Sequence, residues 1–429
     1  MLLTPLPPSP WLAGAPPAPA TPALTENTTT SIAIVGAGYT GLCAALHLTR
    51  KGVSVRVLDA LEPGAGGSGR NGGQVIPSWK YDPDDLLRLF GQEQGQQLID
   101  LFSGTVEEVF QLIAQEQLAC DARRSGWIQA AHDEVAVRTI QKRAAQWQAR
   151  GVAAQVLDRD GMTQWLGSDF YPGGWLDPRA ANLNPLAYAR GLARAALQAG
   201  AQVHGQTRVI KLEPIGTRWR LHLSTGASLD AEQVLLATNA YTDELWPQLR
   251  QTLIAANSFQ LATPPLTESQ RKHVLPGGAS VSDTRRVLRY FRVDAAGRLI
   301  MGGRGPFREP KGPEDFSHLD RSVYQMFPVL KGTSFEFRWA GRVGLTRDFM
   351  PHLHRPAPGV LACVGYNGRG VGLATSMGRR LAEHLLDPQG SPLPLPLTQI
   401  QPIPLHGLHT VYVSVLIAWY RFLDALGVG

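Results

Sequence analysis

The strongest constraint on the fold of this chain is the glycine-rich turn Gly36-Ala37-Gly38-Tyr39-Thr40-Gly41, which lies between two apolar segments. Residues 32–35 precede it as a short apolar run, typical of a strand buried on both faces. Residues 42–50 follow with helical character, and residues 53–57 form a second strand that ends at Asp59. Strand, glycine turn, helix, strand and acid in this order predict a dinucleotide-binding unit.

Each part of this motif has a physical role in such a unit. Gly36 permits the tight turn, Gly38 lets the backbone approach a pyrophosphate, and Gly41 lets helix and strand pack closely. The helix N-terminus attracts the anion, and Asp59 can accept a hydrogen bond from a ribose hydroxyl. The alternative is a glycine turn in an unrelated α/β unit, but the flanking strands, helix and acid favour the dinucleotide.

Composition narrows the function classes. A chain of 429 residues with 44% hydrophobic composition can form two to three domain-sized cores. The net charge is +6, but the arginines are dispersed and no basic run is interleaved with aromatics, so we expect no nucleic-acid partner. Three isolated cysteines, Cys43, Cys120 and Cys363, lack disulfide or metal-ligand spacing. We therefore expect a cytoplasmic protein without a metal.

The two ends of the chain differ from its middle. Residues 1–30 are rich in Pro, Ala and Thr and lack the pattern of a signal peptide, which predicts a disordered extension. Residues 391–429 comprise a Pro-rich linker and a C-terminal helix whose apolar run, Val411 to Tyr420, is too short to span a bilayer. We expect this helix to pack on the protein, with peripheral membrane contact as the alternative.

Two further glycine-rich loops suggest cofactor contacts. The loop at residues 62–73 follows the second strand, so it is either a linker or a contact for the far end of a cofactor. Near the C-terminus, a strand at residues 360–364 runs into Gly365-Tyr366-Asn367-Gly368-Arg369-Gly370 and a helix over 371–386. The N-terminus of that helix offers backbone donors to an anionic group.

The remaining pattern predicts strands for most of residues 253–303, with a hairpin over 287–301, and a helix that begins at Asn184-Pro185. Residues 233–237 read as a strand that returns beside the first strand of the sheet. The hairpin region is dense in arginine: Arg285, Arg286, Arg289, Arg292, Arg298, Arg304 and Arg308. These arginines either charge an exposed strand edge or bind a substrate carboxylate.

Several of these segments together resemble FAD-dependent oxidoreductases of the D-amino-acid-oxidase type. The matching segments are residues 36–41 with Asp59, Ser68-Gly69-Arg70-Asn71-Gly72-Gly73-Gln74, residues 288–303, Trp339-Ala340-Gly341 and residues 365–371. Within that family the chain is most similar to the gamma-glutamylputrescine oxidase branch, with glycine, sarcosine and pipecolate oxidases as wider relatives. The resemblance covers about residues 30 to 428.

The resemblance implies an α/β fold with an α+β substrate part. Residues 31–85, 180–250 and 335–390 would form a Rossmann-like FAD-binding domain of the glutathione-reductase type. Residues 86–179 and 251–334 would form a substrate domain on an antiparallel sheet. The implied cofactor contacts are Gly36, Gly38, Tyr39, Thr40, Gly41, Asp59, Ser68, Arg70, Asn71, Gly72, Gly73, Gln74, Val209, Thr238, Gly341, Gly368, Arg369, Gly370 and Val371, with Val209 at the adenine.

Two departures from the family pattern bear on the chemistry. Sarcosine oxidases attach flavin through a cysteine after the Trp-Ala-Gly segment, but residues 342–348 contain none, so we expect FAD to bind without a covalent link. Those enzymes also hold a lysine near the flavin, and the hairpin at residues 287–308 contains none. The electron acceptor is therefore open between oxygen and a quinone.

The resulting hypothesis is hydride transfer from the C–N bond of a small carboxylate-bearing amine, similar to pipecolate or sarcosine, to FAD, which gives an imine. Gamma-glutamylputrescine is the alternative substrate. We expect Arg289, Tyr290 and Arg369 in the catalytic site, with Arg289 as the anion contact. A nicotinamide-dependent dehydrogenase and a non-catalytic flavin-binding protein are the competing classes.

Overall fold

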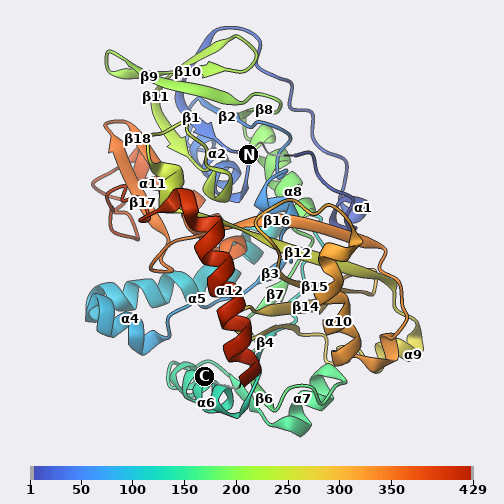
Figure 1. The fold of residues 1–429 in the computed structure, drawn as a ribbon. Coiled ribbons are helices and arrows are strands. Elements are labelled where there is room, and N and C mark those ends of the chain that lie inside the picture. Colours follow the sequence, from blue (N-terminus) through green and yellow to red (C-terminus); the bar gives the residue numbers. More distant parts are fainter. Residues whose placement is uncertain (1–3, 427–429) are drawn as a thin grey trace.

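The computed structural model describes residues 4–426, and only the backbone of residues 418 and 421–426 (Figure 1). Its first sheet has the strand order β17-β18-β11-β1-β2-β8, and β10 and β9 extend from β11. The strands are β1 Thr28–Val35, β2 Val55–Leu58, β8 Gln202–His204, β9 Val209–Ile215, β10 Arg218–Leu223, β11 Ser228–Leu236, β17 His352–Ala357 and β18 Val360–Val364. β11 is parallel to β1, which confirms the predicted return of that strand.

A second sheet has the order β16-β12-β15-β14-β13-β4-β6-β5 and is antiparallel except between β13 and β4. Its strands are β4 Trp127–Ala131, β5 Gln155–Leu157, β6 Gly173–Asp177, β12 Ile254–Pro265, β13 Ser280–Asp283, β14 Arg289–Val293, β15 Arg298–Arg304 and β16 Phe337–Leu345. A short pair, β3 Gln74–Val75 and β7 Ala181–Asn182, lies apart from both sheets. The predicted hairpin is present as β14 and β15.

Helices surround the sheets: α1 Pro10–Gly14, α2 Tyr39–Thr49, α3 Gly67–Arg70, α4 Pro83–Phe90, α5 Gln92–Gln115, α6 Glu134–Gln148, α7 Arg159–Leu166, α8 Pro185–Gln198, α9 Glu268–Arg271, α10 Ser317–Met326, α11 Gly370–Leu386 and α12 His409–Leu426. α8 begins where the sequence predicts, because Asn184 Oδ1 accepts the Leu186 and Ala187 N–H groups at 3.1 and 3.0 Å. Pro185 occupies the first turn, where its fixed φ angle already matches that of a helix.

Two elements cross the boundaries expected between the cofactor and substrate domains. β16 lies in the range 335–390, yet it pairs with β12 in the second sheet. α5 lies in the range 86–179, yet its apolar side chains join one buried cluster with α2 and α11. The placement of β16 follows from its pairing with β12, and that of α5 from the burial of its apolar side chains. Neither contact can be read from the order of segments in the sequence.

The N-terminal segment, residues 4–27, is packed on the protein, so the prediction of disorder for residues 1–30 is wrong over the described part. Ser9 caps α1, and Trp11 is 2% exposed, with its ring edge-on to Trp339. The carbonyl of Pro16 accepts a hydrogen bond from Arg190 at 2.8 Å. Proline has no backbone N–H, so a Pro-rich segment forms few backbone hydrogen bonds of its own. Its carbonyls accept hydrogen bonds from arginine side chains of the rest of the protein, and composition does not predict such contacts.

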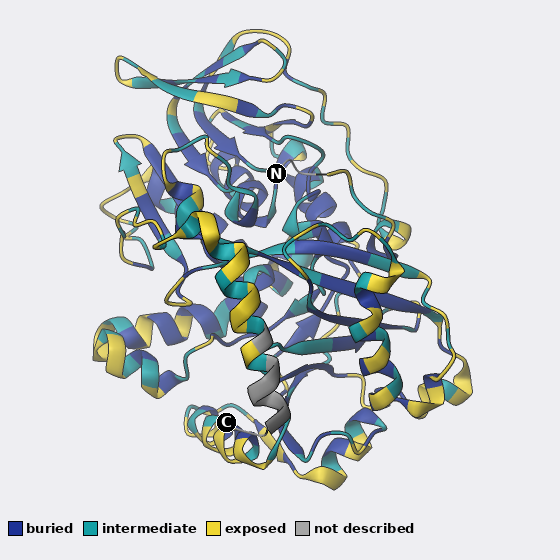
Figure 2. Cartoon of the chain, viewed as in Figure 1, coloured by how far each residue is buried: buried dark blue, intermediate teal, exposed yellow. Residues whose placement is uncertain are grey.

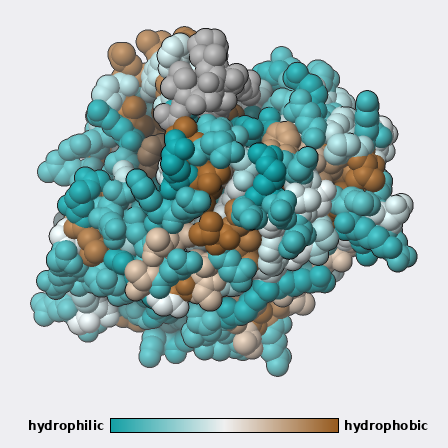
Figure 3. Space-filling model, turned by 90° about the horizontal axis from the view of Figure 1, so that it is seen from below, coloured by the Kyte–Doolittle hydropathy of each residue, from teal (hydrophilic) through white to brown (hydrophobic). Residues whose placement is uncertain are grey.

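The C-terminal helix α12 crosses the front of the molecule (Figure 1). Figure 2 shows exposed residues along it. Val411 is 63% exposed and Val415 66%. No described helix is long and apolar enough to cross a membrane. Figure 3 shows a mostly hydrophilic lower face with separate hydrophobic patches. Peripheral membrane contact through α12 and a cytoplasmic location stay predictions.

Candidate functional site

The turn after β1 is shaped by glycines that leave no room for side chains. Gly36 has a φ of +109°, in the region that favours glycine. A Cβ at Gly41 would lie 2.0 Å from the Gly36 carbonyl oxygen, so Gly41 allows α2 to pack against the turn. These two contacts support the roles predicted for Gly36 and Gly41.

The N-terminus of α2 is open toward a cavity. Its N-cap residue, Gly38, has no side chain to accept N–H groups; the Tyr39 N–H donates to Ser68 Oγ at 3.1 Å, and Gly38, Tyr39 and Thr40 line the cavity. Asp59 stands beside this turn, where its carboxylate accepts the Ala37 N–H at 2.7 Å and the Leu61 N–H at 2.9 Å. Burial raises the pKa of Asp59, and these two hydrogen bonds oppose that rise.

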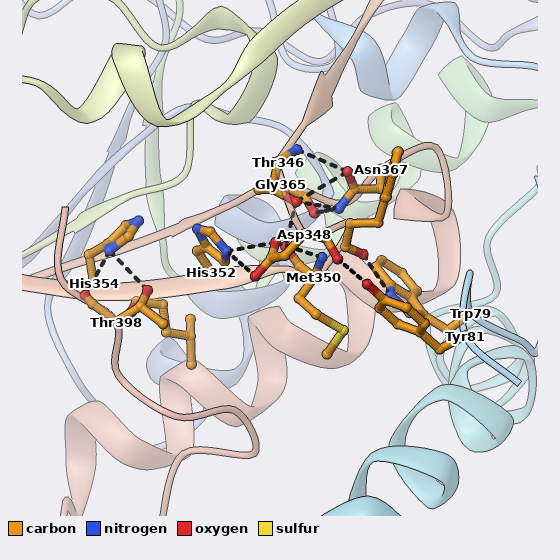
Figure 4. A network of polar contacts seen from close by, with 12 residues as sticks. Trp79, Tyr81, Thr346, Asp348, Met350, His352, His354, Gly365, Asn367 and Thr398 are labelled. Atoms are coloured by element: carbon orange, nitrogen blue, oxygen red, sulfur yellow. Dashed lines mark hydrogen bonds and ion pairs between the residues drawn. The ribbon is translucent and has the colours of Figure 1, made fainter. Parts of the chain in front are cut away.

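The second strand–turn–helix unit, β18 to α11, faces the same cavity. Arg369 is the N-cap of α11 and makes no side-chain cap, so this helix also presents free N–H groups. Thr40 Oγ1 and Tyr366 Oη are 2.6 Å apart, which joins the two glycine turns directly. Asn367 fixes the second turn, since it accepts the Thr346 N–H at 3.0 Å and donates to the Gly365 carbonyl (Figure 4).

The two turns and the loop after β2 enclose a cavity of about 520 Å³. Most of the predicted cofactor contacts line it: Gly36, Gly38, Tyr39, Thr40, Asp59, Ser68, Arg70, Asn71, Gly72, Gln74, Thr238, Gly341, Gly368, Arg369, Gly370 and Val371. Two open helix N-termini that face one cavity suit an anionic ligand such as a flavin dinucleotide. The residues present therefore fit FAD.

Three predicted contacts lie outside the lining of this cavity. Gly41 packs under the first turn, and a Cβ at Gly73 would lie 2.2 Å from the Leu183 carbonyl oxygen, so both glycines serve packing. Val209 is buried at the start of β9. Its contact with the adenine stays a prediction.

Arg70 lines the cavity, but its guanidinium is held by the N-terminal segment. It donates to the carbonyls of Thr4, Pro5 and Ala65, the last at 2.7 Å from Nε. Its own carbonyl accepts hydrogen bonds from Gln260 at 2.6 Å and Trp339 at 3.0 Å. Arg70 thus ties the cofactor loop to the second sheet and to the start of the chain.

The second sheet supplies the opposite wall of the cavity. Tyr290 lines it, and its hydroxyl is 2.7 Å from Ser258 Oγ. Burial raises the pKa of Tyr290 well above its usual value, so the phenol stays protonated at neutral pH. A Cβ at Gly72 would lie 2.7 Å from the Tyr290 ring, which places this ring against the cofactor loop.

Arg289 does not line this cavity, and its role as the anion contact stays a prediction. Its guanidinium lies 5.9 Å from the centre of the Phe170 ring, and its backbone N–H donates to Asp283 Oδ1 at 2.9 Å. The reason is strand alternation: Arg289 shares a face with buried Phe291, while Tyr290 points to the other face.

Sequence reasoning missed Lys80, which lines both this cavity and a smaller one beside it. Trp79 donates to the Phe349 carbonyl at 2.8 Å and Tyr81 to the Asp348 carbonyl at 2.7 Å, and these bonds fix the segment on both sides of Lys80 (Figure 4). Its side chain is exposed at the two cavities, in a crevice of the protein that still weakens its hydration. Desolvation, then the charges of Arg369 and Arg143, lowers its pKa to about 7.

Arg369 and Arg304 add two further cations to the lining. The Arg369 guanidinium lies 4.9 Å from the centre of the Trp127 ring, and burial, then Arg143, lowers its pKa to about 10. Arg304 is the last residue of β15 and lies outside the sequence motifs described above. No sequence signal separated Arg304 or Lys80 from other basic residues, because only the fold brings them to the cavity.

A dinucleotide cradle, two open helix N-termini and a polar antiparallel wall around one cavity define a cofactor-dependent oxidoreductase. The chain belongs to the FAD-dependent oxidoreductase (DAO) family, which it matches over residues 31–384. It is an enzyme of this family and takes FAD as its cofactor, which excludes the nicotinamide alternative as well as the non-catalytic one.

Individual relatives agree with this assignment. The chain is 32% identical to "Probable oxidoreductase OrdL" of Rhizobium meliloti (strain 1021), with 95% of each chain covered. It is 31% identical to gamma-glutamylputrescine oxidoreductase of Escherichia coli (strain K12), over 84% of this chain and 85% of the relative. Its fold matches the crystal structure of glycine oxidase from Geobacillus kaustophilus with a TM-score of 0.73, at 18% identity, over 86% of this chain and 99% of the other.

Proposed function

We propose that this enzyme oxidises the C–N bond of an amine that also carries a carboxylate, with gamma-glutamylputrescine preferred over pipecolate or sarcosine. The observation that carries the proposal is the shared cavity: the two glycine turns form one wall, and Tyr290, Ser258, Lys80 and Arg304 face it from the others. The preference is supported by the 31% identity to gamma-glutamylputrescine oxidoreductase. The imino acids are the second candidates.

FAD, when bound, supplies the acceptor for the hydride that leaves the substrate carbon. The N-termini of α2 and α11 would hold its anionic groups, and Asp59 would hold the ribose. No described cysteine or histidine lines the cavity, which supports binding without a covalent link. Cys43, Cys120 and Cys363 are buried elsewhere.

The substrate amine must lose its proton before a hydride can leave. Lys80 is suited to accept that proton, since it faces the cavity and its pKa of about 7 leaves much of it neutral at neutral pH. Tyr290 and Ser258 can orient the amine by hydrogen bonds, because their hydroxyls form one pair on the wall. The imine product would then be hydrolysed in water.

The test is anaerobic bleaching of the bound flavin by a panel of amines. Gamma-glutamylputrescine, pipecolate, sarcosine and putrescine are each mixed with the flavin-loaded enzyme under nitrogen, and the absorbance of oxidised flavin is followed. We expect the fastest loss with a carboxylate-bearing amine. A panel in which putrescine is the best substrate would contradict the proposal. Re-oxidation by air or by a quinone then identifies the electron acceptor.

A further inference from the structure

Arg304 stands at the end of β15, on the wall that faces the cofactor turns. Strand alternation puts Ile300, Gly302 and Arg304 on one face of the sheet. A Cβ at Gly302 would lie 2.1 Å from Tyr290 Cζ, so the Tyr290 ring covers Gly302. Arg304 is therefore the next position along the same face, and Ser258 lies directly opposite it on β12.

The charge of Arg304 has no partner among the residues that the structure describes. Other arginines of this region are paired: Arg298 with Glu336 at 3.0 Å, and Arg308 with Asp315. Arg304 has instead the ring of Phe307, whose centre is 5.3 Å from its guanidinium carbon. No acid competes for this guanidinium, so an anion that enters the cavity can bind it in bidentate fashion.

Arg304 is also partly buried. Desolvation lowers the pKa of Arg304 to about 10, so the group is still charged at neutral pH but has lost part of its hydration. A guanidinium charge that has lost part of its hydration and has no counter-charge destabilises the protein. A carboxylate bound to Arg304 would offset that destabilisation.

Apolar side chains of the C-terminal helix line the same cavity as Arg304. Val413, Leu416 and Ile417 of α12 line the cavity. α12 and the second sheet thus bring apolar side chains and the Arg304 guanidinium to the same cavity, an arrangement that suits an aliphatic chain ending in a carboxylate.

We propose that Arg304 is the specificity-determining residue that binds the substrate carboxylate. The identity of the oxidised amine rests on the proposed function above, whereas the anion site rests on the placement of Arg304 alone.

The test uses a probe that cannot be oxidised. Glutarate and its uncharged counterpart glutaramide are titrated into the flavin-loaded enzyme, and binding is followed by isothermal calorimetry and by the shift of the flavin absorption band. Arg304→Met is compared with wild type and with Arg321→Met, which removes an exposed arginine on α10. Flavin content and melting temperature confirm that each variant is folded, and Arg304→Lys replaces Arg304→Met if the latter loses flavin.

We expect glutarate, but not glutaramide, to bind at least about tenfold more weakly to Arg304→Met, with Arg321→Met unchanged. Arg304→Lys should retain part of the affinity, because it keeps the charge and loses the bidentate geometry. Equal glutarate affinity in wild type and Arg304→Met would overturn the proposal, as would the absence of binding to wild type. If glutarate behaves as expected but no amine bleaches the flavin, the proposed function fails and the anion site stands.

Discussion

The two walls of the cavity are built from different parts of the chain. The cofactor wall is made of backbone: the glycine turns at Gly36 and Gly365, and the helix N-termini that follow them. The substrate wall is made of side chains, Lys80, Ser258, Tyr290 and Arg304, which come from a loop and three strands.

This difference separates what the backbone fixes in this chain from what a change of side chain could alter. A backbone cradle depends on glycines whose added Cβ would collide with neighbouring backbone, as at Gly41. A wall of side chains can change its charge and shape while the sheet beneath it stays the same. We infer that cofactor choice is set by the fold, whereas substrate choice is set by a few residues on β12, β14 and β15.

The largest effect is expected from a substitution that places a side chain on the cofactor wall. Gly38→Val places a side chain in the path of the pyrophosphate, so we expect complete loss of bound FAD in the purified protein. Gly104→Val is the matched control, because a Cβ at Gly104 on α5 meets nothing within 4 Å. The absorbance ratio at 450 and 280 nm measures the FAD content. A Gly38→Val protein that stays as yellow as the control would contradict the placement of the cofactor.

The way FAD is held should follow from the same wall. Backbone donors make no covalent bond, so acid precipitation should release all of the flavin into the supernatant. Absorbance of supernatant and pellet is compared after centrifugation. Flavin that remains with the washed pellet would show a covalent link that the cavity lining does not explain.

On the substrate wall, Lys80→Met should change the pH dependence of the reaction. Lys80 has a lowered pKa of about 7, so in wild type it is protonated below pH 7 and able to accept a proton above it. We expect kcat/KM of wild type to rise through pH 7. In Lys80→Met, kcat/KM at pH 7 should fall by roughly a hundredfold, and its rise should move toward the pKa of the substrate amine.

Lys272→Met, an exposed lysine beyond α9, is the matched control for that experiment and should keep the wild-type profile. The profiles are measured with the best amine of the panel at saturating acceptor. Identical pH profiles for Lys80→Met and wild type would remove Lys80 from the mechanism.

The smallest effect should come from the N-terminal segment, which supports the cofactor wall from outside. Trp11 is buried against Trp339, and the Arg292 guanidinium lies 4.7 Å from the centre of its ring. Trp11→Ala should therefore lower the free energy of unfolding by about 3 kcal/mol. Thermal unfolding measures it, with Trp419→Ala, at a residue 53% exposed on α12, as the control. Equal melting temperatures for the two variants would show that the segment contributes nothing.

The sequence predicted the parts of the site that depend on backbone. The glycine turns, the parallel return of β11 and the start of α8 at Asn184 follow from local spacing, and all three are present. Arg289 and Tyr290 were both expected in the catalytic site; Tyr290 lines the cavity and Arg289 does not, because alternate residues of a strand face opposite sides of the sheet.

The parts that were missed depend on contacts between distant segments. Lys80 reaches the cavity because Trp79 and Tyr81 donate hydrogen bonds to the carbonyls of Phe349 and Asp348. No local sequence pattern predicts these contacts. The order of the N-terminal segment depends on Trp11, a single anchor within a Pro-rich composition typical of disorder. In the described structure Arg298 and Arg308 pair with acids and Arg292 donates to backbone carbonyls, whereas Arg304 faces the cavity, and no local pattern in the sequence encodes these differences.

The most direct test of the two-wall arrangement is a crystal structure of the FAD-loaded enzyme with glutarate. We expect the flavin between the glycine turns and Tyr290, with a glutarate carboxylate within hydrogen-bond distance of the Arg304 guanidinium. Glutarate bound to Arg369 or outside the cavity, with Arg304 still without a partner, would contradict it.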